Sequence, residues 1–230
     1  MTLEVCIDSH EGALVAARFG AKRVELCSAL SVGGLTPSIG LVSECAEVIE
    51  VHAMLRHREG DFVYTARDIE IMLDDIDFLA KSGASGIVFG CLTEQNEIAS
   101  KANAVLIKEA KDLGLETTFH RAFDFSQNPK ESLKKIIDLG FDRLLTAGQK
   151  SKAIDGIGLI RDLVEWSGGR IEIMAGSGVN AANAMKLAHA GIDALHFTSY
   201  TGTELQNTFG MGVKTIPDPK KIESISNLFR

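Results

Sequence analysis

Cysteine, basic charge and long apolar runs are all scarce in this sequence of 230 residues. Four scattered cysteines are too few for a disulfide scaffold, which favours a reduced, cytoplasmic protein. With 24 Lys and Arg against 31 Asp and Glu, the net charge is −7, which argues against nucleic acid or an anionic membrane as a partner. There is no long apolar run, and no basic region followed by an apolar stretch at the N-terminus, so we expect neither a transmembrane helix nor a signal peptide.

The sequence does contain a repeated junction, in which a glycine follows a helical pattern and precedes an apolar strand. Its clearest copies are FGAKRVEL (19–26), SGASGIVF (82–89), LGLETTF (113–119), LGFDRLLT (139–146) and AGIDALHF (190–197). Glycine readily adopts the left-handed backbone conformation that ends a helix. Because the junction always runs in the same sense, it predicts parallel strands that alternate with helices.

The pattern predicts eight strands and seven clear helices in one domain. The strands are expected at 3–8, 22–27, 50–56, 86–90, 115–121, 142–147, 170–175 and 194–199. The helices are expected at 9–19, 38–48, 66–82, 97–113, 129–139, 151–167 and 179–190. Eight such units in this length favour a TIM-like (β/α)8 barrel over an open doubly wound sheet, with functional residues at the C-terminal ends of the strands.

The eighth helix of this barrel is expected to be irregular or missing. Residues 1–200 are assigned to the barrel, and 201–230 to a C-terminal tail of the same domain. Within the tail, only DPKKIESISNLF (218–229) has a helical pattern. We expect the tail either to cap the barrel or to reach a neighbouring subunit, which implies a homodimer. The role of residues 201–218 is left open.

Strand side chains alternate between two faces, and this alternation separates polar from apolar residues in the predicted strands. In LEVCID, Glu4 and Cys6 share one face while Val5 lies on the other, and VELCS repeats the pattern with Glu25 and Cys27. Barrel interiors are normally filled by Val, Ile and Leu, and buried charge is costly unless it is paired. A face that gathers carboxylates, imidazoles and thiols therefore predicts a site inside the barrel. The candidates for acid–base catalysis are Glu4, Glu25, His52, His120, Glu172 and His196.

The loops after the strands are rich in groups that bind anions. The planar guanidinium of arginine matches carboxylate and phosphate groups. Glycine lets backbone N–H groups approach an anion, and barrels often hold phosphate in the loops after their last strands. The alternatives are local ion pairs for the charged residues and structural turns for the glycines. The candidates for binding an anionic substrate are Arg56, Arg58, Asp61, Arg121, Asp124, Gly148, Gln149, Lys150, Gly176 and Gly178.

Several of these stretches together carry a family resemblance. They are LEVCIDS, GAKRVELCSALSVGGLTPS, the loop from Arg56 that ends in GDFVY, GIVFGCLTE, TFHRAFD, LLTAGQKS and IMAGSGV. Over residues 2–199 the sequence resembles the CutC family of copper-homeostasis proteins. The resemblance implies a TIM-like barrel, a link to copper tolerance, and binding of Cu(I) by Cys6 and Cys27.

Two functions therefore stay open, and the copper hypothesis is placed first because of the resemblance. Thiolates are soft ligands that select Cu(I), and neighbouring strands lie about 4.8 Å apart, so Cys6 and Cys27 could share one ion with Met54 as a third donor. Free buried cysteines, however, are mostly inert. The residues themselves favour a barrel enzyme. It would be an isomerase, lyase or hydrolase that acts on a small anionic or sugar-like substrate through Glu and His acid–base chemistry or a divalent metal.

Overall fold

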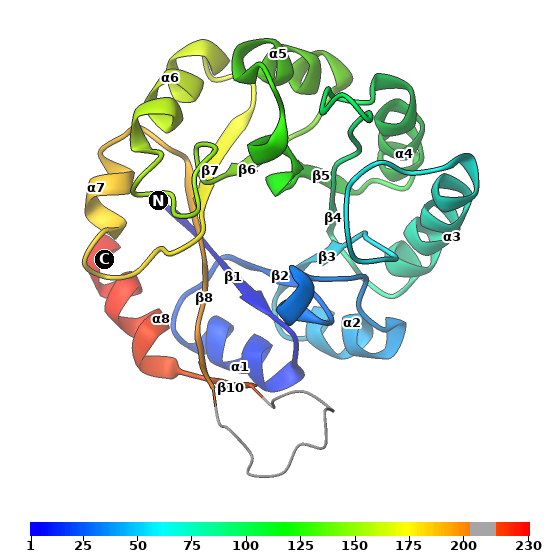
Figure 1. Ribbon diagram of the computed structural model, residues 1–230. Coiled ribbons are helices and arrows are strands. Elements are labelled where there is room, and N and C mark those ends of the chain that lie inside the picture. Colours follow the sequence, from blue (N-terminus) through cyan, green and yellow to red (C-terminus); the bar gives the residue numbers. More distant parts are fainter. Residues whose placement is uncertain (203–214) are drawn as a thin grey trace.

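The computed structural model describes residues 1–202 and 215–230. Eight parallel strands, hydrogen-bonded in sequence order, close into a barrel with the helices around its outside (Figure 1), so the predicted TIM-like (β/α)8 barrel is confirmed. The strands are β1 (Thr2–Ile7), β2 (Arg23–Leu26), β3 (Glu50–Met54), β4 (Gly86–Phe89), β5 (Glu116–Phe119), β6 (Arg143–Thr146), β7 (Glu172–Gly176) and β8 (Ala194–Thr198). The helices are α1 (His10–Arg18), α2 (Ile39–Ala46), α3 (Ala66–Lys81), α4 (Ser100–Asp112), α5 (Pro129–Leu139), α6 (Ile157–Ser167), α7 (Ala184–Ala188) and α8 (Pro219–Ser226). A small antiparallel sheet pairs β9 (Tyr200–Gly202) with β10 (Thr215–Pro217).

Several helices begin where the sequence supplies a capping side chain. Ser9 accepts a hydrogen bond from the backbone N–H of Gly12 at the start of α1. Asn128 accepts a hydrogen bond from the N–H of Glu131 at the start of α5. Pro129, the first residue of this helix, has no backbone N–H that would need an acceptor. Each of these bonds satisfies a backbone donor that the first helical turn leaves without a partner. The capping residues therefore set where these two helices start.

The largest differences from the predicted helices are at α6 and α7. α6 begins at residue 157 rather than 151, and α7 spans only 184–188, because turns occupy the residues before them. Ahead of α7, the side-chain amides of Asn180 and Asn183 both donate to the carbonyl of Gly178 and hold the chain in a turn. Within the part of the chain that the structure describes, no helix combines the length and apolar character needed to cross a membrane.

The eighth strand is not followed directly by a helix, which is the irregular eighth unit that the sequence predicts. β8 ends at Thr198, the β9–β10 sheet follows, and α8 begins only at Pro219. α8 lies beside α1 (Figure 1), and its Ile222 and Ile225 are buried in the main hydrophobic core. Both predicted roles of the tail, capping the barrel and reaching a neighbouring subunit, fall mostly on residues 203–214, which lie outside the described residues.

The strands sort their side chains as the alternation predicts. Outward-facing residues such as Val5, Val24 and Leu195 belong to one large hydrophobic core between the strands and the helices. The inward-facing apolar residues form two small separate clusters instead. One contains Cys6, Cys27, Met54 and Val88, and the other contains Leu145, Met174 and Ala194. Much of the remaining interior is charged or polar, which is unusual for a barrel core and places reactive groups inside the fold.

Candidate functional site

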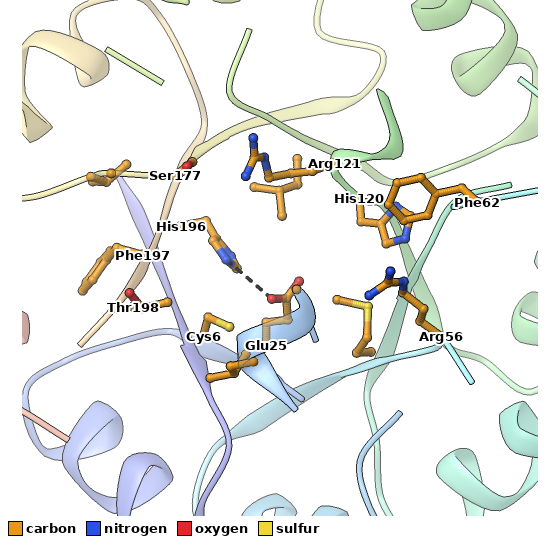
Figure 2. Close-up of a pocket in the computed structure, with 16 residues that line it drawn as sticks. Cys6, Glu25, Arg56, Phe62, His120, Arg121, Ser177, His196, Phe197 and Thr198 are labelled. Carbon is orange, nitrogen blue, oxygen red and sulfur yellow. Dashed lines mark ion pairs between the residues drawn. The ribbon is translucent and has the colours of Figure 1, made fainter. Parts of the chain in front are cut away.

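A pocket of about 330 Å³ opens where the barrel interior meets the loops at the C-terminal ends of the strands (Figure 2). Small-molecule sites commonly enclose about 300–1,000 Å³ and combine apolar walls with a few polar groups. Its apolar lining comes from Leu30, Met54, Phe62, Leu145, Val179 and Phe197. Seven predicted site residues also line it: Cys6, Glu25, Arg56, His120, Arg121, Gly178 and His196.

Three reactive side chains, those of Cys6, Glu25 and His196, converge on one wall of this mouth pocket. In the closed barrel β1 lies between β2 and β8, and the register places Cys6 beside Glu25 on one side and Thr198 on the other. His196 Nε2 lies 3.5 Å from Oε2 of Glu25 (Figure 2). One possible ligand atom from each residue lies within 4.8 Å of the others, so the three could hold a metal ion together. Only barrel closure brings these residues from opposite ends of the chain together.

His196 is held between two carboxylates. Its Nδ1 lies 2.9 Å from Oε1 of Glu4, while its Nε2 faces Glu25. Burial alone would lower the pKa of His196, but the charge of Glu25 and hydrogen bonds to Cys6 and Glu4 hold that pKa well above its usual value. Burial also raises the pKa of Glu25, although the neighbouring imidazolium opposes this shift. The wall thus combines a protonated imidazole with a carboxyl group whose proton affinity is increased.

The two interior thiols are neutral. A hydrogen bond to Cys27 and burial raise the pKa of Cys6 well above its usual value. Although a hydrogen bond from Cys6 favours its thiolate, burial and the nearby Glu25 raise the pKa of Cys27 to about 11. Cys27 is fully buried, and a Cβ added at Gly34 would lie 2.9 Å from its Sγ and 3.5 Å from Cε of Met54. Glycine at position 34 therefore lets the loop after β2 cover the sulfur atoms closely.

The other side of the mouth pocket carries His120, Arg56 and Phe62 (Figure 2). Burial, together with the positive charge of Arg56, lowers the pKa of His120 to about 3, so this imidazole is neutral. Its Nδ1 accepts a hydrogen bond from the backbone N–H of Ala122, which assigns the ring proton to Nε2. The ring of Phe62 packs edge-on against His120, with 4.8 Å between the ring centroids. His120 is therefore a fixed hydrogen-bond donor.

Three buried polar atoms of pocket residues have no hydrogen-bond partner within the described residues: Oε1 of Glu25, Nε2 of His120 and Nε of Arg56. Buried polar groups are nearly always paired, so these three atoms are places where an ordered water or a ligand can supply the missing partner. The terminal nitrogens of Arg56, in contrast, donate to the carbonyls of Val32, Gly34 and Gly60. The terminal nitrogens of Arg56 thus tie two mouth loops together, while its Nε has no partner within the described residues.

Three of the six predicted catalytic residues lie below the mouth pocket, which corrects their predicted position. Glu4 is fully buried and its Oε2 accepts a hydrogen bond from Nε of Arg23 at 2.5 Å. Glu172 is the first residue of β7 and pairs with Arg23 and Arg143 at 2.6 and 3.1 Å. His52, in the middle of β3, points towards the carboxylates of Glu50 and Glu116, at 3.2 and 3.5 Å. Alternation correctly places all three inside, but it does not show their height along the barrel axis.

A second group with metal-ligand geometry, Glu50, His52 and Glu116, also lies at this lower end. Lys22 pairs with Glu50 at 3.7 Å, and Arg143 pairs with Glu116. Because cations of the chain itself already balance these carboxylates, the group is a structural ion-pair network.

Two charged residues of the third loop pair with each other rather than with the mouth pocket. Nη2 of Arg58 lies 3.0 Å from Oδ1 of Asp61 and also donates to the carbonyl of Val63 at 2.6 Å. Neither Arg58 nor Asp61 lines the mouth pocket. The local ion pair, which was the alternative interpretation of this loop, is what the structure contains.

The loop after β6 does not offer the free amide donors that the sequence predicts. The carboxylate of Asp124 accepts hydrogen bonds from the backbone N–H groups of Ala147 and Gln149, and from the Thr146 hydroxyl at 2.6 Å. The N–H of Gly148 donates to the Thr146 hydroxyl oxygen. Asp124 therefore organises this loop, and the N–H groups of residues 147–149 have no capacity left for an anion.

Gly176 and Lys150, two further candidates for anion binding, do not line the mouth pocket. A Cβ at Gly176 would lie 2.6 Å from Cδ1 of Leu145, so glycine here makes room for an interior side chain. The backbone carbonyl of Lys150 accepts a hydrogen bond from Arg121 at 3.4 Å. Ser177 and Thr198 line the mouth pocket but were not among the predicted site residues. Thr198 shares the inward face of β8 with His196, and that signal was available in the sequence.

Comparison with known proteins agrees with the sequence resemblance. The model of the CutC family matches residues 1–201. A CutC family protein from Pasteurella multocida is 44% identical over 201 residues, which cover 86% of this chain and 82% of the relative. A CutC family protein from Vibrio atlanticus is 45% identical over 199 residues, which cover 85% of this chain and 81% of the relative.

A solved structure agrees as well. It is a CutC protein from Streptococcus agalactiae that is assigned to copper homeostasis by name. It superposes with a TM-score of 0.81 and 34% sequence identity, covering 86% of this chain and 98% of that chain. Family model, relatives and barrel geometry thus lead to one assignment, and the chain belongs to the CutC family.

Proposed function

We propose that the mouth pocket is an acid–base active site for a small anionic substrate. The observation that carries this proposal is the set of unpaired buried atoms, Glu25 Oε1, His120 Nε2 and Arg56 Nε, on residues that line one cavity. Leaving a buried donor or acceptor without a partner costs about 1–3 kcal/mol, and a bound substrate with both acceptor and donor groups removes that cost.

Each polar group has a defined role in this proposal. Glu25 moves the proton, because its raised pKa brings the carboxyl group nearer to neutral pH, where a general base is most effective. Protonated His196 lies 3.5 Å away and is oriented by Glu4. His120 donates from Nε2 to a substrate oxygen and stabilises the negative charge that develops when Glu25 removes a proton. Isomerases, lyases and hydrolases all use such a set.

Solvent deuterium exchange tests this proposal. The protein is incubated in D₂O with a panel of small aldoses, ketoses and 2-oxo acids, with and without phosphate groups, and NMR follows the loss of carbon-bound protons. We expect exchange with the wild-type protein and none with Glu25→Gln. The matched control is Glu44→Gln on the exposed face of α2, which should exchange like the wild type. Exchange that persists in Glu25→Gln, or a panel without any exchange, contradicts the proposal.

Cu(I) binding is a second candidate, supported by the name of the Streptococcus relative. The specific observation is that Cys6, Cys27 and Met54 share one interior cluster, and that Cys6 is hydrogen-bonded to His196. Sulfur and imidazole ligands suit Cu(I). In this proposal the ion is cargo that enters through the mouth pocket, where Cys6 is accessible. All four cysteines are free, which supports a reducing compartment such as the cytoplasm.

Competition with a chromophoric Cu(I) chelator under reducing conditions tests the second candidate. We expect Cys6→Ser and Cys27→Ser to weaken Cu(I) binding. The matched control is Cys45→Ser, because Cys45 is equally buried but belongs to the outer core. Affinity should also rise with pH, since the raised pKa values of Cys6 and Cys27 mean that binding releases protons. Unchanged affinity in both serine variants rules out the thiolate site.

A further inference from the structure

The loop after β7 presents three consecutive backbone amides at the edge of the mouth pocket. Ser177, Gly178 and Val179 all line the pocket, and within the described residues none of their N–H groups donates a hydrogen bond. The loop is held through its oxygens instead. The hydroxyl of Ser177 donates to the carbonyl of Ser151 at 2.7 Å, and two asparagine side chains donate to the carbonyl of Gly178. The position of the loop is therefore fixed without using its amides.

Arg121 reaches the same edge of the pocket from the loop after β5. Its Nε donates to Asp124 at 2.8 Å and its Nη2 to the carbonyl of Lys150 at 3.4 Å, while Nη1 has no partner among the described residues. Lys150 is followed by Ser151, the residue that holds Ser177, so one short segment contacts both Arg121 and the loop after β7. Figure 2 shows Arg121 and Ser177 across the pocket from Cys6 and Glu25.

Further positive charge lies beside this edge. The side chain of Lys152 packs over Gly178, where a Cβ would lie 3.0 Å from Cγ of the lysine. Neither Lys150 nor Lys152 forms an ion pair within the part of the chain that the structure describes. Neither lysine lines the pocket, but both belong to the segment that contacts Arg121 and the loop after β7, and in a protein with a net charge of −7 they add a local positive field that attracts anions.

We propose that this anion corner, formed by Arg121 and the amides of Ser177–Val179, binds the phosphate group of a small phosphate monoester. Several other predicted anion ligands have partners within the protein: Arg58 pairs with Asp61, the terminal nitrogens of Arg56 hold loop carbonyls, and the amides of 147–149 donate to Asp124 and Thr146. A phosphate dianion has three terminal oxygens, which suit three amides and a guanidinium better than the two oxygens of a carboxylate do.

The corner also explains how a substrate lies in the mouth pocket. When the phosphate group of a substrate binds at Arg121, the rest of the substrate extends across the cavity towards Glu25 and His120. There it meets the unpaired acceptor Oε1 of Glu25 and the unpaired donor Nε2 of His120. In this orientation, a carbon atom that carries a carbonyl or hydroxyl group lies beside Glu25, the proposed general base. The inference rests on the proposed acid–base function, and narrows its substrate to phosphorylated sugars or similar carbonyl compounds.

Calorimetric titration with inorganic phosphate tests the anion corner directly, without any enzymatic readout. We expect Arg121→Gln to weaken phosphate binding by about tenfold or more, since a hydrogen bond to a charged group contributes about 1.5–3 kcal/mol. The matched control is Arg58→Gln, which removes the same charge at the mouth but outside the pocket, and it should bind like the wild type. Equal affinity for phosphate in Arg121→Gln and the wild type, or equal weakening in both variants, overturns the proposal.

A second measurement avoids any dependence on the folding of a variant. In the wild-type protein, phosphate should shift the NMR amide signals of Ser177, Gly178 and Val179, and acetate should bind more weakly. Unshifted signals, or acetate binding as tight as phosphate binding, contradict a phosphate site. Glu25→Gln separates this inference from the function on which it rests. If Glu25→Gln binds phosphate but the wild-type protein exchanges no carbon-bound proton of any substrate, the anion corner is supported and the catalytic proposal is refuted.

Discussion

The lower and upper ends of the barrel interior contain the same residue types in different states. At the lower end, Arg23 joins Glu4 to Glu172, and Arg143 joins Glu172 to Glu116. At the mouth, the carboxylate of Glu25 and the imidazole of His120 each have one atom without a partner within the described residues. Inward-facing charge is therefore not by itself a sign of function. What distinguishes the two ends is whether the chain supplies every partner, and four predictions test this difference.

The largest effect is expected from breaking the lower network. Arg23→Met removes one of the two partners of fully buried Glu4 and one partner of Glu172, and removing one member of a buried ion pair costs about 3–5 kcal/mol. Urea denaturation measures this as a loss in the free energy of unfolding. The control, Arg67→Met, breaks an exposed pair with Glu70 on α3 and should cost less than about 1 kcal/mol. Similar losses in both variants would show that the lower network is not structural.

A smaller effect is expected from the equivalent change at the mouth. Glu25→Gln removes one of the two carboxylates beside His196, but Glu4 still pairs with that imidazole and the Oε1 of Glu25 has no partner, so the free energy of unfolding should fall by less than in Arg23→Met. Glu4→Gln, the same substitution in the paired network, should cost several times more. If Glu25→Gln is the more destabilising of the two, the difference between the two ends of the interior does not hold.

The pH dependence of stability gives a third comparison. The pKa of His196 is raised above its usual value of 6.5, so its protonated form stabilises the folded state below that pH. This contribution is lost as the pH rises through the raised pKa of the folded protein. The stability difference between the wild type and His196→Gln should therefore shrink from about pH 6.5 upwards, as chemical denaturation at a series of pH values measures. A difference that grows with pH contradicts the assignment.

The smallest effect concerns His120, whose pKa is lowered to about 3 by burial and by Arg56. Its ring signals in NMR should not titrate between about pH 5 and 8, and its nitrogen shifts should show a proton on Nε2. A titration midpoint near the usual histidine value would mean that His120 is not the fixed neutral donor of the mouth pocket.

The sequence predicts the barrel well because its signals are local. Glycine junctions identify the strand–helix units, and alternation places Cys6, Glu25 and His196 inside. Alternation repeats every two residues, so it cannot separate Glu4 at the lower network from Cys6 at the pocket. The partners of a loop are also non-local. The amides around Gly148 look free in the sequence, and only the folded chain shows that Asp124 from the preceding unit accepts from two of them.

The pairing of β1 with β8 has a consequence for how the protein is made. Cys6 and Glu25 lie in the first two strands of the barrel and His196 lies in the eighth, so a chain with only seven strands formed has no complete cluster. The three side chains that could hold a metal ion therefore come together only when the barrel closes. Completion of the fold and acquisition of the site are one and the same event.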